Sequence, residues 1–249
     1  MREIVALDRI IFEARARAIE AVQKRERGMV DYAALMKNLY GVTVEGKVTN
    51  ARARTLFNVL AFFEESFIRQ MLRSVEIKDL GPVHGRWKDK ARKMELNEDV
   101  FSSRASYGTG NMAKVTETVH VILHEFIHAL DEHFGFSKSA RWLGLSGWKR
   151  SPQETPPGYE RYIEKRPGWK KLKDVIHSDW IHRKDAAFVR RYAGRNPYED
   201  FTEHLTFYIM GLITKFKNEG GHRKLAFVRK AYRLLAQDPS LVFYWLRAE

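Results

Sequence analysis

Apolar residues recur at helical spacing along most of the 249-residue chain. In chain order, the spacing predicts helices over 4–23, 31–40, about 49–71, 116–134, 197–216 and 222–237. Gly28, Gly41 and Gly135 follow three of these segments, where a residue with a left-handed backbone commonly ends a helix. The chain is therefore expected to be mostly helical.

Two short segments depart from helical spacing. Residues 75–80 alternate with a period of two before Gly81 and Pro82 interrupt them, and 93–97 forms a similar run flanked by charge. Both are predicted to be strands. Residues 135–190 hold four tryptophans and four prolines and are expected to be irregular. These patterns together predict an α+β fold, mostly helical with a small mixed sheet.

The change of pattern near residue 74 suggests two parts. The first, 1–73, is expected to be an N-terminal helical region that serves packing. The second, 74–249, is expected to be the domain that carries chemistry, with an insertion at about 135–190.

The amino-acid composition limits which metal ligands and which cellular compartment are expected. There is no cysteine, so a zinc site in this chain would use histidine and carboxylate ligands. No apolar run approaches the roughly 20 residues that span a bilayer. The first twelve residues mix charges among apolar positions, unlike a secretory signal. An intracellular, cytoplasmic protein is expected, although export by a non-classical route would leave no trace here.

The strongest chemical signal lies in the helix predicted over 116–134. His124, Glu125 and His128 form an H-E-x-x-H motif. Residues four apart lie on one helical face, so both imidazoles can reach one ion, while Glu125 lies about 100° round the helix, where it can act as a general base. Two surface histidines would give the same short pattern. His120 extends the row by one turn, but three ligands on one straight helix would span roughly 12 Å. His120 is therefore expected to line the site or to be polar surface.

A third ligand must come from elsewhere in the chain. Asn196 and Pro197 are typical of a helix start, and Glu199 and Glu203 follow on one face. Glu199 lies three residues after Asn196, so it could also be the glutamate of a capping box without any metal role. The pairing of the two motifs favours a catalytic zinc held by His124, His128 and Glu199.

These two segments resemble the anthrax lethal factor group of gluzincin metallopeptidases, which includes the Pro-Pro endopeptidases. His124-Glu125-Phe126-Ile127-His128-Ala129-Leu130-Asp131 is similar to that family's H-E-F-G-H-A-x-D. Tyr192 precedes Glu199 by seven residues, and Glu203 follows four later, as in the family. The resemblance implies a zincin-like fold. It also implies Glu199 as a zinc ligand, Glu203 as a residue that supports a ligand, and Tyr192 as the group that stabilises the oxyanion.

Two departures limit the resemblance. Ile127 stands where the family often has glycine, and the long segment between His128 and Glu199 prevents any transfer of substrate specificity. Asp131 could accept a hydrogen bond from a ligand imidazole, or it could be a solvated helix residue. The expected function is a zinc-dependent endopeptidase in which Glu125 takes the proton of a zinc-activated water. The strand around 94–97 is expected to pair with an extended substrate.

The formal net charge of +13 favours anionic partners. From Lys165 to Arg195 there are ten lysines or arginines against three aspartates, which either form a basic lip for acidic or nucleic-acid-associated substrates or are simply solvated. The alternative function is a basic nucleic-acid-associated or virion-type structural protein that retains the zinc fold without turnover. Metal-dependent hydrolysis of a non-peptide amide is a third reading of the same residues.

Overall fold

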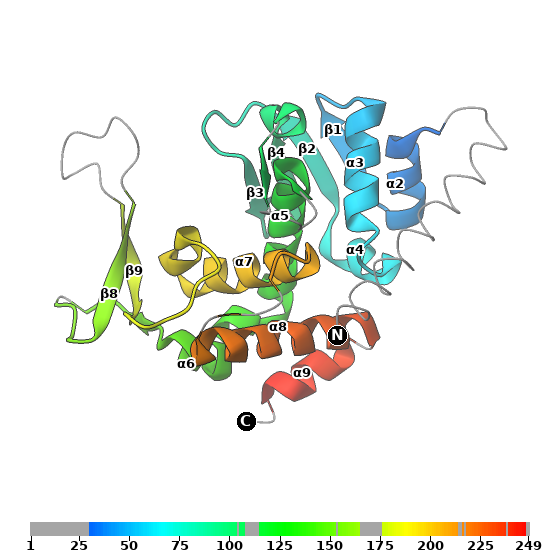
Figure 1. Cartoon of the computed structure of the whole chain (residues 1–249). Coiled ribbons are helices and arrows are strands. Elements are labelled where there is room, and N and C mark those ends of the chain that lie inside the picture. The colour runs from blue at the N-terminus through cyan, green and yellow to red at the C-terminus, as the bar shows by residue number, and fades with distance from the viewer. Residues whose placement is uncertain are drawn as a thin grey trace. The chain divides into compact units, whose positions relative to one another are not determined.

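The computed structural model describes residues 30–103, 105–107, 115–152, 154–164, 176–213, 216, 218–237 and 239–247 (Figure 1). The helix predicted over 4–23 lies outside these residues. The chain divides into two compact units, Met1–His133 and Phe134–Glu249, which are described in turn. The expected separation of a helical region, 1–73, from a chemical domain, 74–249, stays a prediction.

The first unit begins with three short helices, α2 (Tyr32–Tyr40), α3 (Asn50–Leu60) and α4 (Glu65–Met71). The helix over 31–40 is confirmed: Asp31 caps its start by accepting from two backbone N–H groups, and Gly41 ends it with φ 67°. The single helix expected over 49–71 is wrong, because the chain turns between α3 and α4. The turn brings Phe63 into the core, where its ring lies 4.6 Å from that of Phe126.

A four-stranded mixed sheet follows, with strands β1 (Thr43–Gly46), β2 (Ser74–Lys78), β3 (Gly85–Lys88) and β4 (Lys93–Asn97) in the order β1-β2-β4-β3. β1, β2 and β4 are parallel, and β3 is antiparallel to β4. The two predicted strands are confirmed as β2 and β4. β1 and β3 were missed because each has only four residues, too few for a periodic signal.

The position of β4 corrects the expected site of substrate pairing. β4 pairs with β2 along one side and with β3 along the other, so both of its edges are already hydrogen-bonded. An extended peptide therefore cannot add to the strand at 93–97. The terminal position next to β4 belongs to β3.

The two faces of this sheet differ in polarity. Val75, Ile77, Met94 and Leu96 are fully buried on the inner face, which is turned toward helix α5 (Glu117–Phe134). The other face carries ion pairs between the glutamates and lysines of β2 and β4. Short connecting elements, η1 (Glu98–Ser102), β5 (Ser106–Tyr107) and β6 (Val115–Thr116), lie between the sheet and α5 in the chain.

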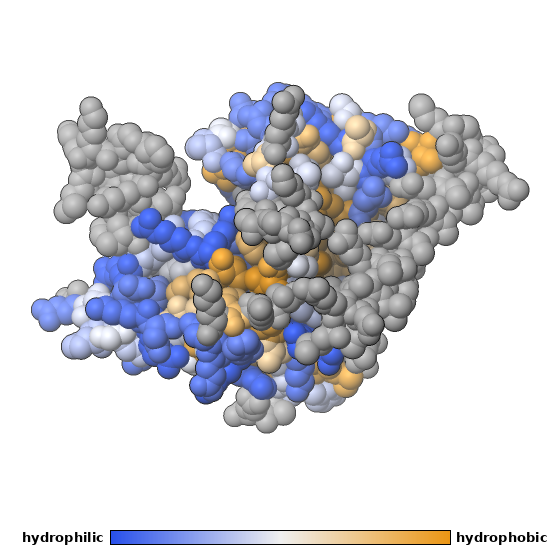
Figure 2. Space-filling model, in the orientation of Figure 1, coloured by the Kyte–Doolittle hydropathy of each residue, from blue (hydrophilic) through white to orange (hydrophobic). Residues whose placement is uncertain are grey.

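The second unit contains more regular structure than the pattern predicted. Residues 135–190 include η2 (Phe136–Lys138), α6 (Ala140–Ser146), β7 (Lys149–Arg150), β8 (Tyr159–Glu164) and β9 (Ile176–Arg183). The expectation of an irregular segment is therefore wrong. The strands form an antiparallel sheet in the order β7-β9-β8, over which hydrophilic residues are visible in Figure 2. The strand signal was weak because β7 is only two residues long and the run of β8 contains several charges.

The unit continues through η4 (Arg191–Arg195), α7 (Pro197–Ile209), α8 (Glu219–Gln237) and α9 (Ser240–Arg247). α7 and α8 confirm the last two predicted helices, although α7 ends earlier than expected and α9 was not predicted. Trp142 of α6 is fully buried, and its ring contacts those of Phe201 on α7 and Phe227 on α8. These aromatic contacts form the centre of the unit's core.

The observed architecture confirms the α+β class, with a small mixed sheet. Among the described residues, no helix is both long enough and apolar enough to cross a membrane.

Candidate metal centre

Helix α5 presents a row of three histidines. Its apolar side is fully buried at Ile122, Phe126 and Leu130, which anchor it in the first unit. His120, His124 and His128 occur every fourth residue and so lie along one strip of the helix. His120 and His124 are buried, and His128 is half-buried. Imidazoles held in this way have restricted orientations, as ligands of a preformed site require.

The geometry of His124 and His128 fits a shared ion. Their Nε2 atoms are 3.1 Å apart, and their rings meet edge to face with centroids separated by 4.7 Å. A tetrahedral zinc ion with Zn–N bonds of about 2.0–2.1 Å would place two ligand nitrogens roughly 3.3 Å apart. The two imidazoles are therefore already close to the spacing that such an ion imposes.

Glu125 lies against the terminal strand of the sheet. A Cβ atom added to Gly85 of β3 would come within 2.8 Å of the Glu125 side chain and 2.9 Å of Val121. Glycine is thus the residue that lets the helix bring this carboxylate up to the strand. Sequence reasoning identified Glu125 but missed Gly85, since a lone glycine gives no signal of what faces it.

In the second unit, α7 carries the two glutamates. Asn196 caps the helix by accepting from the Glu199 N–H at 2.9 Å, and Pro197 occupies the first helical position. The Glu199 side chain is oriented by a neighbour, since its Oε1 accepts a hydrogen bond from the Tyr192 hydroxyl at 3.0 Å. The roles that the resemblance implies for Tyr192 and Glu199 stay predictions.

The Tyr192 hydroxyl is held in its protonated form. Burial raises the pKa of Tyr192 above its ordinary value of 10.0, and the negative charge of Glu199 raises the pKa further. Arg195 acts in the opposite direction and approaches the hydroxyl oxygen at 3.3 Å. The tyrosine is therefore a hydrogen-bond donor at neutral pH.

Glu203 has a different environment, because Arg190 neutralises it. The side chain of Glu203 is fully buried, and both of its oxygens accept from the Arg190 guanidinium, one of them at 2.6 Å. This is the paired geometry in which arginine binds carboxylates most strongly. No local pattern marks Arg190, which is one of many basic residues in its segment.

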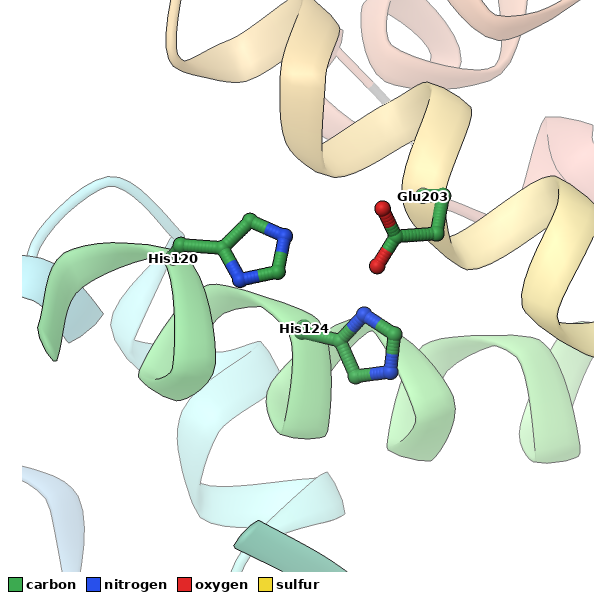
Figure 3. A group of neighbouring side chains, drawn as sticks. All are labelled: His120, His124 and Glu203. Carbon is green, nitrogen blue, oxygen red and sulfur yellow. The ribbon is translucent and has the colours of Figure 1, made fainter. Parts of the chain in front are cut away.

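Two groups of side chains have ligand atoms close enough to hold a metal ion. His120, His124 and Glu203 form one group, in which all three residues are buried, and Figure 3 shows their side chains turned toward one another. His124, His128 and Glu199 form the other. In each group the ligand atoms lie within 4.8 Å of one another. The chain thus has a possible metal site of histidine and glutamate, and His120 belongs to it more closely than sequence reasoning expected.

Asp131, the remaining candidate, is only 2% exposed. It is therefore not a solvated helix residue, and its expected hydrogen bond to a ligand imidazole stays a prediction.

Comparison of the chain with protein-family models, with curated proteins and with solved structures finds no match in any of the three.

Proposed function

We propose that the chain is a zinc-dependent endopeptidase of the gluzincin type, with a zincin-like fold that resembles the lethal factor group. The observation that carries this proposal is the group His124, His128 and Glu199, together with the 3.1 Å separation of the two Nε2 atoms. Two imidazoles and one carboxylate are a common protein ligand set of a catalytic zinc, which leaves a position open. A zinc ion held there would supply a Lewis acid and make a water molecule acidic near neutral pH.

Of the two groups, we assign the metal to the one that contains Glu199. Glu203 already has its charge compensated by Arg190, so a cation next to it would compete with a guanidinium. The Tyr192 hydroxyl donates to Oε1 of Glu199 and orients this carboxylate. Glu203 and Asp131 are then supporting residues, and His120 lines the site.

The protein groups have separate tasks in this proposal. Glu125 accepts a proton from the attacking water and later delivers it to the leaving amine. Tyr192 donates a hydrogen bond to the developing oxyanion, in place of the bond that it makes to Glu199. β3 replaces the strand at 93–97 as the partner of an extended peptide, because β3 is the terminal strand and its Gly85 lies beside the Glu125 side chain.

The test combines zinc content with hydrolysis of a broad peptide library. We expect about one zinc per chain, lost in Glu199→Ala, and a 10²- to 10⁴-fold fall in kcat for Glu125→Gln with zinc retained. Glu132→Gln, an exposed carboxylate on the same helix, is the matched control and should leave both unchanged.

Two outcomes would decide against the proposal. Full zinc occupancy in Glu199→Ala removes Glu199 as a required ligand. Zinc binding by the unaltered chain without hydrolysis of any peptide favours the alternative, a basic structural protein that keeps the metal site without turnover. An anionic partner is proposed from the net charge alone.

A further inference from the structure

Asp200, the residue after Glu199, lies at the centre of a buried polar cluster inside the second unit. Its side chain is fully buried, and the Lys224 ammonium of α8 donates to its two oxygens at 2.7 and 2.8 Å. Oδ2 also accepts from the Trp148 indole at 2.9 Å and from the Ser146 hydroxyl at 3.1 Å. His204, one turn further along α7, lies 3.0 Å from Oδ1. Every one of these groups converges on a single carboxylate.

Lys224 is as completely buried as its partner. Beyond its two bonds to Asp200, the ammonium donates to the carbonyl oxygen of Ala187 at 2.6 Å, and the Phe188 ring lies 4.2 Å away. All three N–H groups of the Lys224 ammonium therefore have an acceptor. Burying two charges is costly and is often no more stabilising than an apolar pair, so the cluster is better explained by the geometry that it imposes.

The connections of Lys224 lead to the proposed metal centre by two routes. Through Asp200, Lys224 holds the first turn of α7. That turn carries Glu199, and the next turn carries Glu203. Through Ala187, Lys224 holds the backbone just before Arg190 and Tyr192. These are the residues that bond to Glu203 and to Glu199. One ammonium thus joins the helix that carries the glutamates to the segment that carries their partners.

We propose that the Lys224–Asp200 pair is a positioning device that keeps Glu199 oriented for metal binding. The effect of this pair on metal binding rests on the proposed function, whereas its contacts within the second unit do not. It assigns a role to two residues that do not belong to the ligand set. Residues that orient metal ligands from behind commonly change metal affinity by 10- to 100-fold when they are replaced.

The test uses the full chain with Asp200→Asn and Lys224→Met together, so that no charge is left buried alone. We expect zinc affinity, measured by chelator competition, to fall 10- to 100-fold. In the metal-free chain, we expect faster amide hydrogen exchange over 187–195 and the first turn of α7. Val228→Ala, a fully buried change one turn along α8, is the control that loosens packing and keeps every residue of the cluster.

The proposal is overturned if the double variant keeps native exchange in these segments, or if Val228→Ala weakens zinc binding equally. Trp148→Phe is a milder variant that removes only the indole donor to Asp200. A several-fold loss of zinc affinity in Trp148→Phe supports the proposal, and unchanged affinity contradicts it. If the unaltered chain binds no zinc, the proposed function fails, while exchange in the metal-free chain still decides the positioning role.

Discussion

Tyr192 is bonded to Glu199 through its hydroxyl, and this contact gives one side chain two possible roles. If the hydroxyl stabilises the oxyanion, Tyr192→Phe should lower kcat by about 10²- to 10³-fold, the usual loss when such a donor is removed. Zinc affinity should then fall less than kcat, because Tyr192→Phe removes a bond that orients Glu199 but leaves the ligand itself in place. Steady-state kinetics and chelator competition measure the two effects separately.

The opposite result would change the assignment of Tyr192. If Tyr192→Phe weakens zinc binding while kcat at saturating zinc stays native, the hydroxyl orients Glu199 and does not contact substrate. Arg195 then becomes the nearest donor to consider, since it approaches the same hydroxyl.

Gly85 is a second residue at which a small change should have a large effect. Its added Cβ would meet the Glu125 side chain at 2.8 Å, closer than side-chain carbons normally come. Gly85→Ala should therefore displace the carboxylate and lower kcat at least 10-fold, with zinc content unchanged because the histidines do not move. Gly144→Ala, for which nothing lies within 4 Å, should be kinetically silent. Native activity in Gly85→Ala would exclude a tightly placed Glu125.

At this scale the sequence marked the candidate ligands but not the residues that contact them. His124 and His128 were identified because a helix converts spacing into geometry. Gly85 and Arg190 act through neighbours that are distant in sequence, so no local pattern marks them. The same holds for Lys224, which looks like one more basic residue of a charged helix.

Among the elements, the four-stranded sheet has a charged outer face that makes stability depend on pH. Glu76 of β2 bonds to Lys78 at 2.7 Å and pairs with Lys93 at 2.8 Å. Hydrogen bonds from these two lysines hold the pKa of Glu76 below its ordinary value of 4.5. The folded state thus binds this proton less readily than the unfolded state. Its contribution to stability is present above pH 4.5 and is lost as the pH falls through the lower, folded value.

Glu76→Gln should therefore flatten the decline in the free energy of unfolding below about pH 4.5. Urea titrations between pH 3 and pH 7 measure that slope. Replacing Lys78 and Lys93 by methionine should flatten it in the same way, because the partners that lower the pKa are then gone. An unchanged slope in both variants would show that other carboxylates control acid unfolding.

The elements also show where hydrophobic periodicity fails to predict secondary structure. Long helices such as α5 and α8 were predicted because many residues report the same period. β1 and β3 were missed because four residues carry almost no periodic signal, and the break after α3 was missed because apolar residues continue through it. The position of β4 inside the sheet depends on which strands pair with it, and the sequence of one strand does not determine its partners.

For the molecule as a whole, the proposed ligands come from segments far apart in the chain, with His128 and Glu199 separated by the segment that includes β7, β8 and β9. The α+β class could be predicted from the sequence, since the sum of local patterns determines it. The grouping of ligands could be predicted only by combining two motifs, because neither segment contains the complete set. A metal ion bound by both segments would therefore stabilise the folded chain and not the unfolded one.

Zinc should accordingly raise the melting temperature. A ligand that binds only the native state adds about 2.7 kcal/mol at one hundred times its dissociation constant. For a chain of this size that corresponds to a rise of roughly 5–10 °C. Chelator should reverse the rise, Glu199→Ala should abolish most of it, and Glu132→Gln should keep it. Equal rises in Glu199→Ala and the unaltered chain would place the ion on other ligands, and the group of His120, His124 and Glu203 would then be the one to replace next.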